Sequence, residues 1–254
     1  MNDGGAMHTL ASILTALFRP TRGLDQVGPA IRWLWIPLAV VLIASVVCKA
    51  VVAAPLQAEA QQAAARAAME QEMEKMPEAD RARLEQDLSS GEFDTAVGIA
   101  NTAAIVFGVV GALVAIFYVA TFFFIAAKTW AGGVSYTSML SAAALMFIPH
   151  AIRNVIQAIY MGATGVFLAH PGLGALVAPQ DPSAAPSVAY AFLSQIDIWV
   201  LWGLAIMFGA LGSKTLGFTK KHAATAMIAF VAITMILQAL PTIISGAFMG
   251  AVGA

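Results

Sequence analysis

The chain has 254 residues, of which 60% are hydrophobic and only 11% are charged, and its mean hydropathy is +0.81. These values exclude an ordinary soluble domain and indicate an all-α, polytopic membrane bundle. The formal net charge is -1, and the basic residues form no patch of the kind that binds nucleic acid, so we expect no nucleic-acid partner.

The residues before the first long apolar run predict a short amphipathic helix that ends at Pro20. Five apolar side chains share one face of this helix: Leu10, Ile13, Leu14, Leu17 and Phe18. Arginines follow at once, which is typical of a helix that lies in the inner interface of a membrane near anionic lipid. Packing of the same face against the bundle is an equal alternative on periodicity alone. We assign residues 1–32 to a cytoplasmic N-terminal segment.

Residues 33–254 form the expected membrane domain, because five apolar stretches reach the length of about 20 residues that a membrane crossing requires. These stretches are Trp33 to Ala54, Val97 to Ala127, Ser138 to Val166, Phe192 to Leu211 and Ala223 to Phe248. The N-terminus, MNDGGAMHTL, lacks a basic n-region, and no small-residue cleavage site follows the first stretch, so we interpret this stretch as a retained helix and not as a signal peptide. Its single cysteine, Cys48, is expected to be a small hydrophobe.

The distribution of lysine and arginine predicts the orientation, since short loops rich in these residues stay in the cytoplasm. The basic residues that flank the spans are Arg19, Arg22, Arg32, Lys128, Lys214, Lys220 and Lys221. Residues 168–191 and the C-terminal tail contain none. We expect a protein of the cell inner membrane with a cytoplasmic N-terminus and a periplasmic or external C-terminus.

The loop between the first two spans, residues 56–95, is acidic and rich in helix-forming residues. Ten of the 14 acidic residues of the chain lie between Glu59 and Asp94. Pro77 divides the loop, and the loop is predicted to form a helical hairpin or to continue the membrane helices outside the bilayer. It serves either as a solvated spacer or as a docking site for a partner.

Polar residues interrupt the third apolar stretch at helical spacing. They are His150, Arg153, Asn154 and Gln157, at i, i+3, i+4 and i+7. Their shared face should look into the bundle, because an unpaired arginine that faces lipid costs about 2.5 kcal/mol or more. The predicted topology brings Arg153 to the depth of Asp197, and we expect the two to form an ion pair. Lys49 either joins this polar cluster or extends to the membrane surface. The cluster is a structural contact or a substrate site.

Motifs for catalysis or metal binding are not visible in the sequence. The four histidines, His8, His150, His170 and His222, lie in different segments, without a second histidine at i+4 or a nearby cysteine pair. We therefore expect neither enzyme activity nor a cofactor or metal.

Several motifs, in their order along the chain, resemble those of bacterial Yip1-domain membrane proteins. The motifs are FRPTRGLD (18–25), WAGGVSYTSML (130–140) with a downstream proline, and DIWVLWGLAIMFGALGSKT (197–215) followed by KKHA. The positions that carry the resemblance are Pro20, Gly132, Gly133, Ser135, Pro149, Trp199, Trp202 and Lys214.

The resemblance implies a five-span integral membrane protein without an assigned catalytic activity. Eukaryotic members are associated with vesicle traffic, small GTPases and organelle shape, but this chain lacks the Asp-Leu-Tyr-Gly-Pro motif of many of them. Two functions follow as hypotheses. The first is a non-enzymatic protein that organises membrane lipids or partners, which are another membrane protein or a second copy of the chain. The alternative is a small transporter or channel that uses the polar cluster around Arg153 and Asp197.

Overall fold

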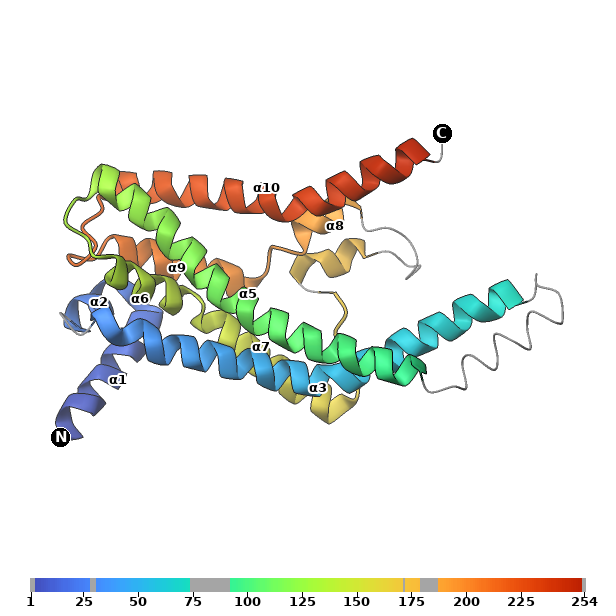
Figure 1. Ribbon diagram of the computed structural model, residues 1–254. Coiled ribbons are helices and arrows are strands. Elements are labelled where there is room, and N and C mark those ends of the chain that lie inside the picture. Colours follow the sequence, from blue (N-terminus) through green and yellow to red (C-terminus); the bar gives the residue numbers. More distant parts are fainter. Residues whose placement is uncertain (1–2, 28–30, 74–91, 171, 179–186, 253–254) are drawn as a thin grey trace. The chain divides into compact units, whose positions relative to one another are not determined.

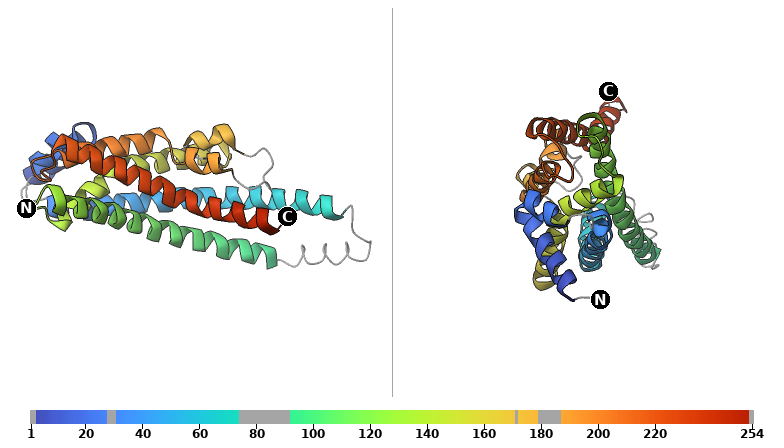
Figure 2. Two further views of the ribbon diagram at one scale, coloured as in Figure 1. Left: turned by 90° about the horizontal axis from the view of Figure 1, so that it is seen from above. Right: turned by 90° about the vertical axis from the view of Figure 1, so that its left-hand side faces the viewer.

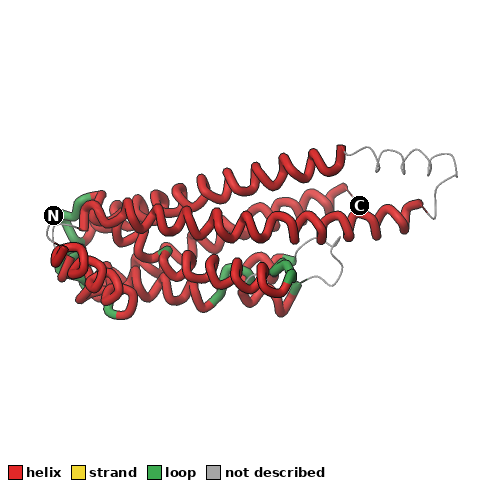
Figure 3. The backbone as a smooth tube through the Cα atoms, turned by 90° about the horizontal axis from the view of Figure 1, so that it is seen from below, coloured by secondary structure: helices red, strands yellow, loops and turns green. Residues whose placement is uncertain are grey.

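The computed structural model describes residues 3–27, 31–73, 92–170, 172–178 and 187–252. These residues form helices joined by loops, without a strand among them, which confirms the predicted all-α fold (Figure 3). The elements are α1 (Asp3–Phe18), α2 (Pro20–Val27), α3 (Ile31–Met73), α5 (Glu92–Trp130), α6 (Tyr136–Met146), α7 (Ile148–Thr164), η2 (Gly172–Val177), α8 (Val188–Leu193), α9 (Ile198–Leu211) and α10 (Lys220–Val252) (Figure 1).

The chain divides into two compact units. Unit 1 consists of Met1–Ile43, Ala112–Arg153 and Ala169–Ala254, and unit 2 consists of Ala44–Gly111 and Asn154–Leu168. The helices α3, α5 and α7 each contribute residues to both units. Within unit 2, α3 and α5 approach closely at a glycine, since a Cβ atom at Gly108 would lie 3.3 Å from Val46 Cγ1.

The apolar helices confirm a multi-pass membrane protein. Four described segments are long and apolar enough to cross a membrane: Ile31–Ala60, Thr102–Trp130, Tyr136–Thr164 and Lys220–Pro241. They coincide with four of the five predicted spans. Two of the helices also extend into the predicted loop at 56–95, because α3 continues to Met73 and α5 begins at Glu92. Residues 74–91, including Pro77, lie outside the described residues.

The fourth predicted span, Phe192–Leu211, is interrupted. The short helix α8 ends at Leu193, and α9 begins only at Ile198 and has 14 residues. At 1.5 Å per residue, α9 is about 21 Å long, which is less than the hydrocarbon core of about 30 Å. The break arises at Asp197, whose backbone is extended and whose Oδ1 accepts a hydrogen bond from Val200 N at 2.7 Å. An aspartate in this N-cap position starts a new helix.

The third span is also formed by two helices, α6 and α7, which meet at Phe147. Pro149 lies in the first turn of α7, where its missing N–H removes no helical hydrogen bond. Before α6, the backbone turns through Gly132 and Gly133, whose φ angles of 62° and 52° favour glycine. Ser135 then caps α6 by accepting a hydrogen bond from Ser138 N at 3.2 Å.

The N-terminal helices α1 and α2 pack against α9 within unit 1. Trp202 Nε1 of α9 donates to the carbonyl oxygen of Leu17 at 3.1 Å, and Thr21 Oγ1 of α2 donates to that of Gly209 at 2.9 Å. Leu17 is buried, whereas Phe18 keeps 76% of its surface exposed and Leu14 keeps 54%. The predicted apolar face is therefore shared: part of it packs on the bundle, and part of it stays uncovered.

Candidate functional site

The ion pair expected between Arg153 and Asp197 is present in unit 1. Arg153 Nη1 donates to Asp197 Oδ2, and the side chains are 18% and 10% exposed. Arg153 lies on α7, and Asp197 lies at the break before α9. Because the other carboxylate oxygen of Asp197 caps α9, both oxygens of this side chain bind a donor. The pair thus fixes the start of α9 against α7.

The other predicted polar residues lie in different surroundings. His150 packs its ring against Phe147, with the ring centroids 5.6 Å apart. In unit 2, Asn154 Nδ2 donates to Ser45 Oγ of α3 at 3.3 Å, which is the hydrogen bond between helices that its position predicts. Gln157 Oε1 is buried without a hydrogen-bond partner among the described residues, and Lys49 is half-buried on α3.

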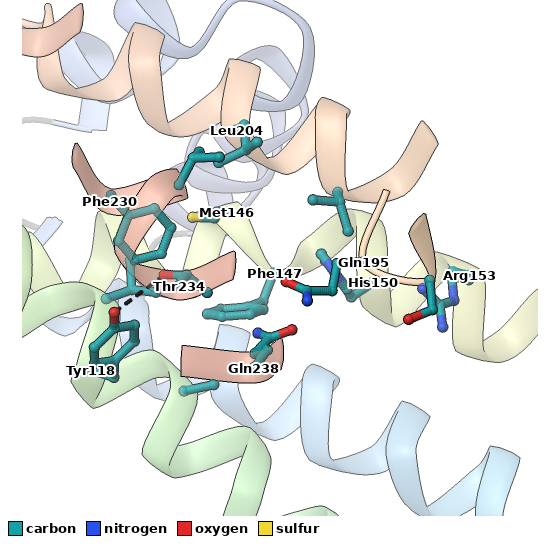
Figure 4. Close-up of a pocket in the computed structure, with 15 residues that line it drawn as sticks. Tyr118, Met146, Phe147, His150, Arg153, Gln195, Leu204, Phe230, Thr234 and Gln238 are labelled. Carbon is teal, nitrogen blue, oxygen red and sulfur yellow. Dashed lines mark hydrogen bonds between the residues drawn. The ribbon is translucent and has the colours of Figure 1, made fainter. Parts of the chain in front are cut away.

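A cavity of about 390 Å³ adjoins the ion pair within unit 1 (Figure 4). It lies between α5, α7, α9 and α10, and the linker between α8 and α9 contributes to its wall. Its polar lining residues are Tyr118, His150, Arg153, Ser194, Gln195, Thr234 and Gln238. Among them, His150 and Arg153 were identified from the sequence. The others were missed because they are divided among three other elements: α5, the linker between α8 and α9, and α10.

The cavity has an apolar end and a polar end. Figure 4 shows Leu204, Met146 and Phe230 at one end, with Tyr118 and Thr234 beside them, and Gln195 next to His150 on the side of Arg153. Tyr118 and Thr234 meet through their hydroxyl groups at 3.2 Å, so these two polar groups satisfy each other. The polar end offers hydrogen bonds to a molecule whose remaining surface is apolar.

Two buried polar atoms belong to the residues at this polar end. His150 Nδ1 and Arg153 Nε have no hydrogen-bond partner among the described residues. A buried polar atom left unpaired costs about 1–3 kcal/mol, and most such atoms find a partner. Both residues line the cavity, although the two nitrogen atoms themselves are covered, so a bound oxygen atom could become their partner only after the side chains turn toward the cavity.

The positions shared with the family motifs lie apart from this cavity. Their roles are local: Gly132, Gly133 and Ser135 form the turn into α6, Pro149 begins α7, and Pro20 lies against Gly209 of α9.

On α9, Trp199 and Trp202 lie with ring centroids 6.1 Å apart. Lys214 donates its backbone N–H to Asp25 Oδ1 at 2.9 Å and leaves its side chain exposed. The motif residues therefore shape turns and helix contacts, and they do not form a common site. Among the described residues, no group of three His, Cys, Asp or Glu side chains could hold a metal ion.

A second feature of unit 1 is a concentration of positive charge at one end, which we call the cationic end. It consists of the exposed side chains Arg19, Arg22, Arg32, Lys128, Lys214, Lys220 and Lys221. The helix ends that carry them gather near α1 and α2 in Figure 1, and the right-hand view of Figure 2 looks onto them. Trp130 stacks on His222 across this end, at 5.4 Å between centroids, which joins α5 to the start of α10.

The comparisons with known proteins agree with this architecture. A family model described as the Yip1 domain matches residues 14–240, from α1 almost to the end of the last apolar span. No curated protein and no solved structure shows significant similarity to the chain. Since the match covers most of the chain, and since the helices are long and apolar enough to cross a membrane several times, this multi-pass membrane protein belongs to the Yip1-domain family.

Proposed function

We propose that the protein is a non-enzymatic membrane protein that organises anionic lipids at its cationic end. The supporting observation is that the seven exposed cations lie at the end of unit 1 where α1 and α2 leave Phe18 and Leu14 uncovered (Figure 1). Exposed apolar side chains beside cations suit the boundary between acyl chains and anionic headgroups. Each Lys or Arg close to an anionic membrane surface contributes about 1 kcal/mol of attraction, which salt weakens.

The proposal requires the cationic end to face the cytoplasm, as the distribution of lysine and arginine predicts. Single cysteines at Ser90 and Lys220, introduced into a Cys48→Ser background, test this orientation with an impermeant thiol reagent on cells with a permeabilised outer membrane. We expect Ser90→Cys to react and Lys220→Cys to react only after lysis. Labelling of Lys220→Cys on intact inner membranes would reverse the topology and contradict the proposal.

Lipid organisation is tested by measuring which phospholipids co-purify with the protein in a mild detergent. Replacing Arg19, Arg22 and Lys214 together by glutamine should lower the ratio of anionic to zwitterionic lipid, because three attractive charges are lost. The matched control replaces Arg19 and Arg22 by lysine and Lys214 by arginine, which keeps the charge. An unchanged ratio in the glutamine variant would contradict the proposal. Specific recovery of a protein partner, or of a second copy of the chain, in place of anionic lipid would also contradict it and would identify that protein as the ligand.

A second candidate function is transport, because the cavity is lined by Arg153, which pairs with Asp197. Buried charges of this kind often mark pathways for ions or solutes. Both carboxylate oxygens of Asp197 already bind donors, however, so the geometry favours a structural pair. Proteoliposomes with a proton gradient separate the two functions. Gradient loss that requires the native protein and disappears in Asp197→Asn would establish transport in place of lipid organisation.

A further inference from the structure

We propose that the cavity between α5, α7, α9 and α10 binds a single-chain amphiphile with an uncharged, oxygen-bearing head. This binding site is separate from the cationic end, so its test does not depend on lipid binding there. Its volume of about 390 Å³ lies at the lower end of the range of ligand pockets, about 300–1,000 Å³. One acyl or similar chain fits this volume, but both chains of a phospholipid do not.

The cavity has an apolar end and a polar end, and this difference sets the orientation of the bound ligand. Leu204, Met146 and Phe230 offer apolar side chains at one end, and the neighbouring hydroxyl groups of Tyr118 and Thr234 bond to each other, so an apolar chain can lie there (Figure 4). At the other end, His150 Nδ1 and Arg153 Nε are buried and unpaired among the described residues. The two atoms themselves are covered, so each side chain must turn toward the cavity before a hydroxyl or carbonyl oxygen of the head can bond to it and offset its desolvation cost.

The backbone around the cavity independently points to a polar interior. Non-helical backbone at membrane depth is tolerated where it is buried in protein or lines a cavity. The link between α8 and α9 is such a segment, and two of its residues, Ser194 and Gln195, line the cavity. Its own donors are paired: Gln195 Nε2 donates to the Ala191 carbonyl oxygen at 2.8 Å. That bond leaves Gln195 Oε1 available to accept from a hydroxyl head.

Charge balance decides between an uncharged head and an anionic head. Asp197 already neutralises Arg153, and its carboxylate lies within bonding distance of the guanidinium. A carboxylate or phosphate head would therefore add a negative charge to a site of low polarity, where an uncompensated charge is costly. An alcohol, ester or monoacylglycerol head adds none. We therefore expect an uncharged amphiphile to bind more tightly than an anionic amphiphile of the same chain length.

Photolabelling of the reconstituted protein tests the site. The probe is hexadecanol with a diazirine in its chain and a terminal alkyne, and the hydrocarbon and carboxylic acid of the same chain length serve as comparison probes. We expect the alcohol to label peptides from α7 and α10 most strongly, with competition by unlabelled hexadecanol. Equal or stronger competed labelling by the acid would overturn the uncharged head.

Two alanine variants on α5 test the location. Ala115 lines the cavity, so Ala115→Trp fills it, whereas Ala104 is exposed on the same helix and does not line the cavity. Competed labelling should fall to background in Ala115→Trp and stay at the wild-type level in Ala104→Trp. The reverse result, or equal labelling in both variants with unchanged elution in size-exclusion chromatography, would overturn the site.

The polar end has its own variants. His150→Phe keeps a ring against Phe147 but removes the nitrogen, and it should reduce the preference for alcohol over hydrocarbon about two- to tenfold, as expected for one lost hydrogen bond. Gln238→Leu changes an exposed side chain at the rim and tests the same preference without disturbing a buried residue. An unchanged preference in both variants would exclude recognition of the head at this end.

Discussion

The two helices of the third span, α6 and α7, are held in the protein by different interactions. Every residue of α6 from Ser138 to Met146 is buried, and five of these nine residues are serine or alanine, which let neighbouring backbones approach closely. In contrast, α7 exposes Ile156, Ile159 and Tyr160 and carries the ion pair and an interhelical hydrogen bond. Close packing thus holds the first half of the span, and polar pairing holds the second half.

Breaking the ion pair on α7 should have the largest effect. Arg153→Ala and Asp197→Ala should each lower the free energy of unfolding by about 3 kcal/mol, because each leaves a buried charge unpaired. The loss for Asp197→Ala also includes a helix cap. We expect the double variant to lose less than the sum, as measured by unfolding in mixed micelles. Additive losses would show that the two side chains act independently.

Close packing at α6 is tested at Gly203 of α9. A Cβ atom at Gly203 would lie 2.6 Å from the carbonyl oxygen of Met146, so α9 and the end of α6 must separate in Gly203→Ala. We expect a loss of about 1–3 kcal/mol in the same unfolding assay. The control is Gly111→Ala on α5, where no atom lies within 4 Å of the added Cβ. Equal free energies of unfolding for the two variants would show that the close approach of α9 to the end of α6 does not stabilise the protein.

The beginning of α6 provides a smaller test. Ser135→Ala removes the N-cap of α6 and should lower the free energy of unfolding by about 1 kcal/mol. Ser135→Asn keeps an accepting oxygen and should retain most of the stability. A loss of the same size in both variants would indicate that the turn, and not the cap, determines stability at this position.

The smallest expected effect is on the second polar contact of α7. Asn154→Leu keeps a similar volume but removes the hydrogen bond to Ser45, and such bonds between membrane helices contribute about 0.6 kcal/mol on average. The free energy of unfolding of Asn154→Leu, measured in the native background and in the Ser45→Ala background, isolates this contribution. A coupling as large as that of the ion pair would mean that α7 depends equally on both contacts.

Much of this fold could be predicted from the sequence, because apolar length and helical spacing are local properties. The polar face of α7 follows from its residue spacing alone, and the pairing of Arg153 with Asp197 follows from depth in the membrane. The break before α9 was missed, since a hydrophobicity window averages over Ser194 to Asp197. A cap signal was nevertheless present, because Asp197 directly precedes an apolar run.

The cavity could not be predicted, because it is formed by residues that are distant in the sequence. Tyr118 lies on α5, Gln195 lies between α8 and α9, and Gln238 lies on α10, and none of them belongs to a sequence motif. The packing of α1 and α2 on α9 also depends on tertiary contacts, such as Pro20 against Gly209. Periodicity showed that Leu17 lies on an apolar face, but it left the partner of that face open.

The contact between α2 and α9 also bears on how the protein is made. Thr21 and its partner, Gly209, are separated by 188 positions in the chain. At about 5–20 residues per second, the ribosome needs about 10–40 s to extend the chain from one residue to the other. During that interval, Leu24, which is fully buried in the finished protein, has no α9 to pack against. The N-terminal helices therefore reach their final packing only after the C-terminal third of the chain, which contains α9, has been synthesised.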